Sequence, residues 1–312
     1  MDSYSGAAYT LFINRDAQPH VETIGDWPHR IPYHRSIEKV PSDIAYDVDG
    51  RAHCGFDIPD GLTRLQWVKL LLETDLDPDK ERLRKAVQVQ STLQALKELN
   101  KTPVQVAGDY LRWLWTNVTE KICESQEDSH LVENAAVTVV MTVPAMWSDK
   151  ARDNTVRAAE LAGISADGRK LKFLNEPEAA AISELKKRIA NGQIDEEDCV
   201  IICDAGGGTV DLVSYQVKQT EPLKLDQKVI AQGDLCGYVF IEHEFQRQLS
   251  GLLQGDVAKL SQKAVAEIAQ RFEYVIKPSY DELAAAEHYI AVPGLEDNEE
   301  RQIKNGSLKI NS

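Results

Sequence analysis

Three consecutive glycines interrupt a β-forming region of this chain, in the stretch "VIICDAGGGTVDLVSYQV" from Val200 to Val217. Glycine weakens a strand because it loses more backbone freedom on folding than other residues, so a run of glycines needs a compensating reason. One such reason is the close approach of a ligand to bare backbone N–H groups. The pattern predicts a strand, a glycine turn and a second strand, with Asp204 near the end of the first strand.

Three kinds of phosphate-binding loop are candidates for these glycines. A P-loop of the form GxxxxGK[ST] does not occur in the chain. A dinucleotide-binding fingerprint opens a helix, whereas these glycines lead into the β-run "VDLVSYQV". A hairpin remains, whose N–H groups can bind an anion, with Asp204 placed to hold Mg²⁺ and Thr209 offering a hydroxyl. The alternative is a flexible β-turn without a ligand.

A second carboxylate stands at the junction of a predicted strand and a predicted helix, in "FLNEPEAAAI". Glu176 directly precedes Pro177, a residue that favours the first turn of a helix. A carboxylate at this position can bind a metal-bound water or orient a nucleophilic water. The alternative is a helix N-terminal charge that interacts favourably with the helix dipole.

Composition excludes several classes of protein. The formal charge of −15 argues against nucleic acid as a partner, because phosphate backbones need clustered Lys and Arg. No apolar run reaches membrane-spanning length, and the N-terminus lacks a signal-peptide pattern. The five cysteines and seven histidines show no metal-ligand spacing, and the odd number of cysteines favours a reducing, cytoplasmic location. Cys203, in an apolar strand, is predicted to be a buried, inert thiol.

Strands and helices alternate through the middle of the chain, which predicts an α/β protein. Thr102 and Pro103 begin a helix, Ser148 caps a second helix, and Pro177 opens a third. The strand "VTVVMTVP" is apolar enough to be buried on both faces. "LQWVKLLLETD" is interpreted as an amphipathic helix that carries Lys69. The polar link 193–198 is a predicted domain boundary.

Several segments together resemble the 70-kDa heat-shock chaperones, most closely their diverged A12-like branch. The segments are "VTVPAMWSDKARDNTVRAAELAGI", "FLNEPEAAAI", "DAGGGTVDLVSYQV" and "GDLCG", in this order. The resemblance extends from about residue 137 to residue 245. It implies an actin-like ATPase fold of two lobes, here residues 1–194 and 195–312, closing on ATP and Mg²⁺.

The resemblance also assigns roles to individual residues. Asp204 matches the family's metal-site aspartate, and Glu176 resembles the glutamate beside the metal and the hydrolytic water. The residues matching the second phosphate loop are Gly206, Gly207, Gly208 and Thr209, followed by Asp211. Pro144 and Arg152 match a proline and an arginine that relay nucleotide state between domains. Gly237, Arg271 and Lys277 are expected nucleotide contacts. Lys69 lies roughly where the chaperones carry a catalytic lysine, but the surrounding motif does not match, so a lysine on an amphipathic helix is the simpler interpretation.

This chain departs from the family pattern at both ends and at one internal position. It begins at "MDSYSGAAY", without the strand and first phosphate loop that the resemblance implies, and stops before the last adenosine loop and the peptide-binding domain. We therefore expect an incomplete domain with an open sheet edge. Tyr238 replaces a small residue next to Gly237, where it would crowd the nucleotide or pack across the cleft.

The sequence therefore predicts an ATP-binding, Hsp70-like protein with weak or absent ATP hydrolysis. Two other functions remain open: a nucleotide-independent interaction protein that retains the scaffold, and a metabolite kinase of the same superfamily. The kinase would need a sugar-binding aspartate motif, which we do not find in the sequence. The expected partners are the nucleotide and unidentified client proteins or co-chaperones, with no nucleic acid and no membrane.

Overall fold

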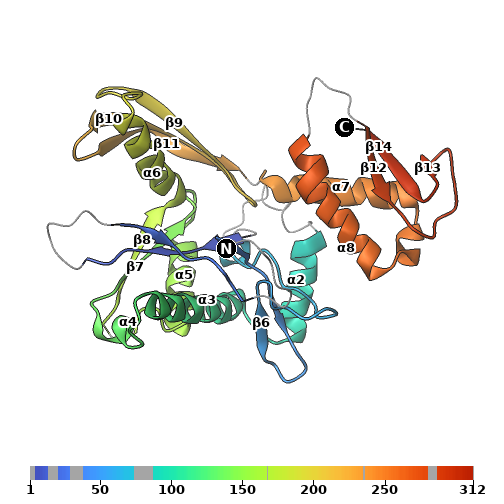
Figure 1. Cartoon of the computed structure of the whole chain (residues 1–312), viewed down its shortest axis with the longest axis horizontal. Helices are drawn as coiled ribbons and strands as arrows, with labels where there is room; N and C mark the ends of the chain where they lie inside the picture. Colours follow the sequence, from blue (N-terminus) through green and yellow to red (C-terminus); the bar gives the residue numbers. More distant parts are fainter. Residues whose placement is uncertain are drawn as a thin grey trace. The chain divides into compact units, whose positions relative to one another are not determined.

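The computed structural model describes residues 4–12, 20–28, 38–73, 87–166, 168–234, 236–279 and 287–311. The chain divides into two compact units, Met1–Phe240 and Ile241–Ser312 (Figure 1). Both units combine helices and strands, which confirms the mixed α/β class. Among the described residues, no helix is both long and apolar enough to cross a membrane.

The N-terminal part of the first unit consists of short antiparallel strand pairs. The pairs are β1 (Tyr4–Gly6) with β4 (Lys39–Pro41), β2 (Ala8–Tyr9) with β3 (Glu22–Thr23), and β5 (Ile44–Tyr46) with β6 (Ala52–Cys54). A 3₁₀ turn, η1 (Leu70–Leu72), and helix α2 (Val87–Glu98) follow. The predicted helix "LQWVKLLLETD" is therefore wrong, because within its described residues, 65–73, the only helical element is this 3₁₀ turn, whose three leucines are buried.

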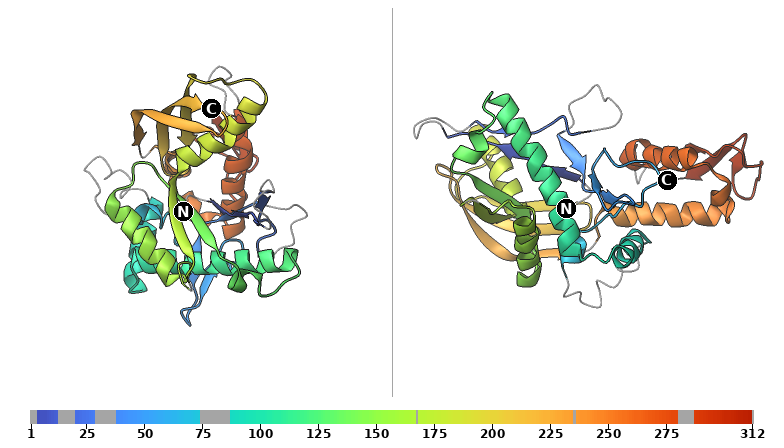
Figure 2. Two further views of the ribbon diagram at one scale, coloured as in Figure 1. Left: turned by 90° about the vertical axis from the view of Figure 1, so that its left-hand side faces the viewer. Right: turned by 90° about the horizontal axis from the view of Figure 1, so that it is seen from below.

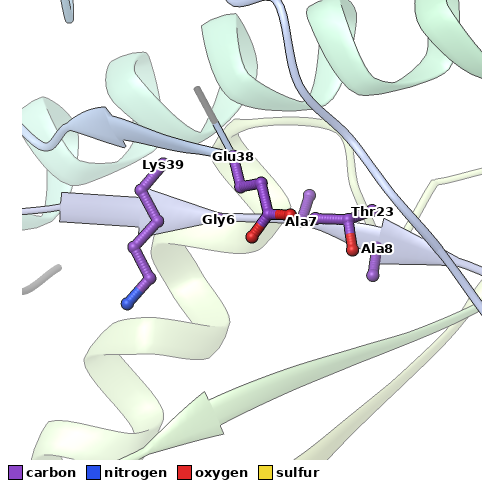
Figure 3. Close-up of a pocket in the computed structure, with 6 residues that line it drawn as sticks. All are labelled: Gly6, Ala7, Ala8, Thr23, Glu38 and Lys39. Carbon is purple, nitrogen blue, oxygen red and sulfur yellow. The ribbon is translucent and has the colours of Figure 1, made fainter. Parts of the chain in front are cut away.

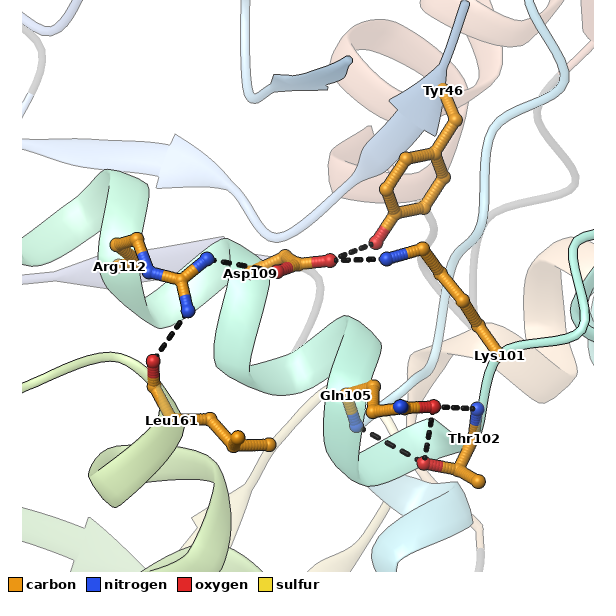
Figure 4. Close-up of polar contacts among 7 residues, drawn as sticks. All are labelled: Tyr46, Lys101, Thr102, Gln105, Asp109, Arg112 and Leu161. Carbon is orange, nitrogen blue, oxygen red and sulfur yellow. Dashed lines mark hydrogen bonds and ion pairs between the residues drawn. The ribbon is translucent and has the colours of Figure 1, made fainter. Parts of the chain in front are cut away.

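Helix α3 (Pro103–Ser125) begins as predicted. The Thr102 side chain accepts a hydrogen bond from the Gln105 N–H, and the Gln105 side chain accepts one from the Thr102 N–H, which completes a capping box (Figure 4). The helix packs closely against α5 (Asp149–Leu161) at Gly108, where a methyl group would lie 2.9 Å from Leu161 Cβ. Because any larger side chain would collide, Gly108 allows the two helices to approach closely.

A half-buried polar network joins α3 to β5 and α5 (Figure 4). The Asp109 carboxylate accepts hydrogen bonds from the Tyr46 hydroxyl at 2.7 Å, the Lys101 ammonium at 2.8 Å and the Arg112 guanidinium at 3.0 Å. Arg112 also donates to the Leu161 carbonyl oxygen. Burial alone would raise the pKa of Asp109, but the hydrogen bonds from Lys101 and Tyr46 outweigh it and hold that pKa below its usual value.

Strands β7 (Thr138–Val143) and β8 (Lys170–Asn175) pair in parallel, with α5 as the crossover between them. Ser148 caps α5 as predicted, and Gly163 follows the helix with φ of 78°. A short helix, α4 (Leu131–Asn134), precedes β7. The prediction that β7 is buried on both faces is wrong. Val139 and Met141 pack against the core, whereas Val140, on the opposite face, is 55% exposed.

A three-stranded antiparallel sheet follows helix α6 (Glu176–Ala190). Its strands are β9 (Cys199–Ala205), β10 (Val210–Gln219) and β11 (Lys224–Asp234), in the order β11-β10-β9. Helix α6 covers one face of this sheet (Figure 2), where Ala181 and Leu185 pack against Val213 and Tyr215. Each buried aliphatic or aromatic side chain here contributes about 1.5–3 kcal/mol of hydrophobic stabilisation.

The second unit contains most of α7, which runs from Tyr238 to Leu253. Its other elements are η3 (Asp256–Lys259), α8 (Gln262–Arg271), the π-helical turn η4 (Phe272–Ile276), η5 (Lys277–Ser279), β12 (Glu287–Ala291), β13 (Ile303–Lys304) and β14 (Ser307–Asn311). The strands form a sheet in the order β12-β14-β13. The rings of Phe245 and Phe272 stack at a centroid distance of 3.9 Å and join α7 to the end of α8.

Candidate functional site

The glycine loop, Gly206–Thr209, connects β9 to β10 as the predicted strand–turn–strand hairpin. The Gly206 N–H donates to the Thr209 carbonyl oxygen at 2.9 Å, and the next pair in the register is Ala205 with Val210. Gly207 and Gly208 are buried, and Gly206 and Thr209 are half-buried. The loop is therefore an ordered, packed turn, which argues against the alternative of a flexible surface turn.

Two segments pack against this loop and require glycine at the contacts. The Gly237 N–H donates to the Gly208 carbonyl oxygen, and the Tyr238 N–H donates to the Gly206 carbonyl oxygen, both at 3.2 Å. A methyl group at residue 237 would lie 2.3 Å from the Gly207 oxygen, and one at residue 208 would lie 2.9 Å from the Leu70 side chain. Because backbone lies so close to backbone, no side chain fits at Gly237.

Lys69 and Glu176 form a buried ion pair. The Lys69 ammonium lies 2.6 Å from a Glu176 carboxylate oxygen and 5.8 Å from the centre of the Trp147 ring. Glu176 is the first residue of α6, directly after β8, so the carboxyl end of that strand presents it. Lys69 is 4% exposed, which is rare for a lysine unless it is paired.

The segment that carries Lys69 is held against the start of α5. Glu73, also buried, accepts hydrogen bonds from the Ser148 N–H at 3.0 Å and the Ser148 hydroxyl at 2.9 Å. The Asn154 side chain donates to the Leu72 carbonyl oxygen at 2.9 Å. These contacts fix the backbone around η1, so that Lys69 meets Glu176 while its neighbour Leu70 packs at Gly208.

Two aspartates lie side by side at the end of the hairpin. Asp204 on β9 is directly opposite Asp211 on β10, so their side chains share one face of the sheet. Asp211 is 1% exposed and Asp204 is half-buried. Like charges directly opposite one another are unfavourable, and hard carboxylate oxygens are the ligands that Mg²⁺ prefers. This donor set therefore fits a divalent cation.

No group of three or more acidic, histidine or cysteine side chains that could hold a metal ion occurs among the residues described. A cation at Asp204 would thus rely on few protein ligands, with waters and phosphate oxygens completing its coordination. This arrangement is typical of Mg²⁺ in phosphate-binding sites and not of a structural metal cage.

Pro144 and Arg152 lie close to the same strand ends. Pro144 is buried directly after β7, and its carbonyl oxygen accepts a hydrogen bond from the Trp147 N–H at 3.3 Å. The Arg152 guanidinium donates to the Asn175 side-chain oxygen at 2.9 Å. Asn175 directly precedes Glu176, so one hydrogen bond connects Arg152 to the residue beside the Lys69–Glu176 pair.

The remaining predicted residues lie elsewhere. Arg271 ends α8 and Lys277 begins η5, both in the second unit, where the Lys277 ammonium lies 3.6 Å from a Glu242 carboxylate oxygen. The Tyr238 ring packs edge-on against Trp67, with ring centres 6.3 Å apart. Cys203 is exposed, so the predicted buried thiol is wrong: it lies on the face of the β9–β11 sheet that α6 does not cover.

A separate hollow of about 250 Å³ opens near the N-terminal strands (Figure 3). It is lined by Gly6, Ala7, Ala8, Thr23, Glu38 and Lys39. None of the residues predicted from the sequence lines it, and its lining lacks the paired carboxylates and glycines of the hairpin. The hairpin with the Lys69–Glu176 pair is therefore the stronger candidate site.

Comparison with known proteins identifies the family. The sequence model described as "Hsp70 protein" matches residues 80–220, a segment that includes Pro144, Arg152, Glu176, Asp204 and the glycine loop. This match confirms the predicted resemblance to the Hsp70 family for residues 80–220. Similar Hsp70-family proteins include the chaperone protein HscA homologs of Actinobacillus pleuropneumoniae serotype 5b (37% identical), Vibrio atlanticus (32%) and Polynucleobacter necessarius (30%).

These alignments cover only part of each protein. They extend over 37%, 48% and 64% of this chain and over 16%, 21% and 29% of the respective relatives. The chain thus matches less than a third of the length of these Hsp70-family relatives. Lys69, Gly237, Arg271 and Lys277 lie outside the segment that the family model matches, so that match does not test their expected roles.

Sequence reasoning underestimated Lys69 and did not identify Trp147 or Glu73. One signal was available for Lys69: it is the single charged residue in the apolar run "WVKLLL", where a lysine is expected to be paired if the run is buried. No local signal pointed to Glu73, because its partner Ser148 lies 75 residues further along the chain.

Proposed function

We propose that this chain binds ATP with Mg²⁺ as an Hsp70-like nucleotide-binding domain of the actin-like ATPase fold. In this proposal residues 1–194 form lobe I and residues 195–312 form part of lobe II. The observation that carries the proposal is the buried Lys69–Glu176 pair, whose neighbour Leu70 packs at the glycine loop. A site for a phosphate ligand explains a buried charged pair beside this tightly packed loop better than a purely structural role does.

Each residue has a role in this proposal. Asp204 and Glu176 would hold Mg²⁺ through an oxygen ligand or a bound water, and the ion would neutralise phosphate charge. The N–H groups of the glycine loop and the Thr209 hydroxyl would bind phosphate oxygens. Lys69 would add positive charge beside them. Arg271 and Lys277 remain proposed nucleotide contacts on the resemblance in sequence alone, and Pro144 and Arg152 would sense the state of the site through Asn175.

We further propose that ATP hydrolysis is slow. Phosphoryl transfer depends on positioning and on donors around the developing charge. In the described structure the Glu176 carboxylate accepts a hydrogen bond from the Lys69 ammonium at 2.6 Å. A carboxylate oxygen occupied in this way is less available to orient an attacking water, so binding without rapid turnover is the expected behaviour.

The test is a calorimetric titration of the whole chain with ATP, with and without Mg²⁺. Binding should require Mg²⁺, and Asp204→Asn should remove that requirement together with most of the affinity. Asp153→Asn, which alters an exposed carboxylate on α5, is the matched control and should bind like the wild type. Absence of heat with Mg·ATP would favour a nucleotide-independent interaction protein. A screen of hydroxylated small molecules for phosphorylation tests the metabolite kinase.

The curated relatives carry the name chaperone, and the matched segments cover less than a third of their length. Of the activities of a chaperone, we propose only nucleotide binding for this chain. Client proteins and co-chaperones are the partners that a full chaperone role would require, and co-precipitation in the presence and absence of ATP would reveal them.

A further inference from the structure

Trp67, two residues before Lys69, has a left-handed backbone, with φ of 60°. For a bulky side chain this conformation is a rare outlier, and it persists only where the surroundings hold it in place. The other non-glycine residues with positive φ in the parts of the chain that the structure describes are all Asp, Asn, Glu or Gln. Glycine or asparagine would be less strained at this position, so we expect the tryptophan ring to make a compensating contact.

The left-handed turn at Trp67 directs the chain into η1. On its N-terminal side, the Thr92 hydroxyl accepts a hydrogen bond from the Gln66 N–H at 3.0 Å and donates to the Gln66 carbonyl oxygen at 2.9 Å. On its C-terminal side, the Trp67 carbonyl oxygen accepts from the Leu70 N–H at 3.0 Å. Lys69 lies within this turn, so the backbone at Trp67 fixes the direction in which the lysine side chain leaves the chain.

The Trp67 ring packs against Tyr238, and both residues lie in the first compact unit. The two rings meet edge to face, with centres 6.3 Å apart and planes inclined at 70°. Trp67 is 7% exposed and Tyr238 is half-buried. Aromatic pairs in this geometry stabilise a structure beyond the area that they bury. Without the Tyr238 ring, the Trp67 backbone would lose a contact that opposes its return to an unstrained conformation.

Tyr238 is also bonded to the glycine loop, because its N–H donates to the Gly206 carbonyl oxygen at 3.2 Å. We propose that Tyr238 is a positioning residue for Lys69: its ring holds Trp67 in the left-handed turn and so keeps the Lys69 ammonium on the Glu176 carboxylate. One residue then holds both the loop backbone and the segment that carries the lysine. As a contribution to nucleotide binding, this role rests on the proposed function.

The position of Lys69 can be measured without a nucleotide, through its chemical reactivity. Brief labelling of the full chain with acetic anhydride, followed by mass spectrometry of its peptides, gives the acetylation rate of each lysine. In the wild type, Lys69 is 4% exposed and should react far more slowly than Lys187, whose side chain is 67% exposed. In Tyr238→Leu the rate at Lys69 should rise about tenfold, because labelling of a buried group follows the population of its locally open form. Tyr238→Phe keeps the ring and should react like the wild type.

Two controls separate positioning from a general loss of stability. Lys101, which is paired with Asp109 at 2.8 Å in the same unit, should keep its wild-type rate in Tyr238→Leu. Trp113→Leu removes another half-buried ring from this unit and should leave Lys69 protected. The proposal is overturned if Tyr238→Leu leaves Lys69 protected, if Lys101 becomes reactive to the same extent, or if Trp113→Leu has an equal effect.

A second substitution tests the route through Trp67. Asparagine adopts the left-handed conformation more readily than tryptophan, so Trp67→Asn removes both the strain and the ring contact. In this background, Tyr238→Leu should raise the rate at Lys69 no further. A further rise as large as the one in the wild-type background would mean that Tyr238 acts on Lys69 by another route, which would refute the proposal.

The labelling needs no nucleotide, so its result is independent of the proposed function. A wild type that binds Mg·ATP in calorimetry, but whose Lys69 stays protected in Tyr238→Leu, would refute the positioning role alone. A wild type that binds no ATP, with Lys69 made reactive by Tyr238→Leu and not by Tyr238→Phe, would support the positioning role and refute only the proposed function.

Discussion

The Lys69 ammonium and the Glu176 carboxylate lie 2.6 Å apart, although 107 residues separate them in the sequence. Their side chains are only 5% and 15% exposed. Burying two charges is costly, and the cost is recovered only when the partners meet with good geometry. The pair therefore links the 3₁₀ turn before α2 to the start of α6. A substitution at either residue should lower both the free energy of unfolding and the affinity for the ligand.

Removing the lysine should destabilise the fold. Lys69→Met leaves the Glu176 carboxylate buried without its ammonium partner, which should lower the free energy of unfolding by about 3 kcal/mol. Urea denaturation of the single variants and of Lys69→Met/Glu176→Gln measures the coupling, and the double variant should recover part of the loss. Lys187→Met, at an exposed pair with Glu184, is the control and should change little. If Lys69→Met and Lys187→Met lower the free energy of unfolding equally, the buried pair contributes no more to stability than an exposed pair.

Gly237 should be essential to the glycine loop. Gly237→Ala places a methyl group 2.3 Å from the Gly207 carbonyl oxygen, so the loop backbone must move and Mg·ATP affinity should fall strongly. The control is Gly251→Ala within α7, where a methyl group meets nothing within 4 Å and alanine should stabilise the helix by about 0.5–1 kcal/mol. Calorimetric titration gives the affinities, and an unchanged affinity in Gly237→Ala would exclude this loop as the phosphate site.

The N-terminal cap of α3 should contribute measurably to stability. Thr102→Ala removes the hydroxyl that accepts from the Gln105 N–H at 3.2 Å, and should cost about 1 kcal/mol. Thr116→Ala on the same helix is the matched control, because the Thr116 hydroxyl donates to the carbonyl oxygen of Arg112 within the helix and caps nothing. Thermal unfolding followed by circular dichroism distinguishes the two, and a similar loss in both variants would contradict the capping role.

The Asp109 network should make stability depend on pH. The pKa of Asp109 is lower in the folded protein than its usual value, so the folded state binds this proton less readily than the unfolded chain. Its contribution is therefore fully present above the ordinary aspartate pKa of about 4 and is lost as pH falls through the lower folded value.

Asp109→Asn should accordingly lower the urea midpoint at neutral pH, with a difference from wild type that shrinks as the medium is acidified. Tyr46→Phe removes one of the three donors and should reproduce part of the effect. Denaturation curves at a series of pH values provide the measurement. A difference between wild type and Asp109→Asn that stays constant down to the most acidic pH would mean that the charge of Asp109 does not matter.

Much of the local structure was predictable from the sequence. The capping box at Thr102, the cap at Ser148, Pro177 in the first turn of α6 and the β9–β10 hairpin all follow from interactions within a few residues. Such interactions depend on residue type and spacing alone, so the sequence was sufficient to determine them. The same holds for the order of Glu176, Asp204 and the glycine loop, which carried the resemblance to the Hsp70 family.

Tertiary structure decided what these local patterns could not. An apolar strand is buried on both faces only if other elements cover both, and β7 and β9 each have one face exposed, at Val140 and Ile201. Likewise, a lysine in an apolar run is buried only if a distant carboxylate meets it, as Glu176 meets Lys69. Burial and charge pairing depend on segments that are remote in sequence. For this reason the local pattern identified the glycine loop, and only the fold brought Lys69 to Glu176 and Leu70 to that loop.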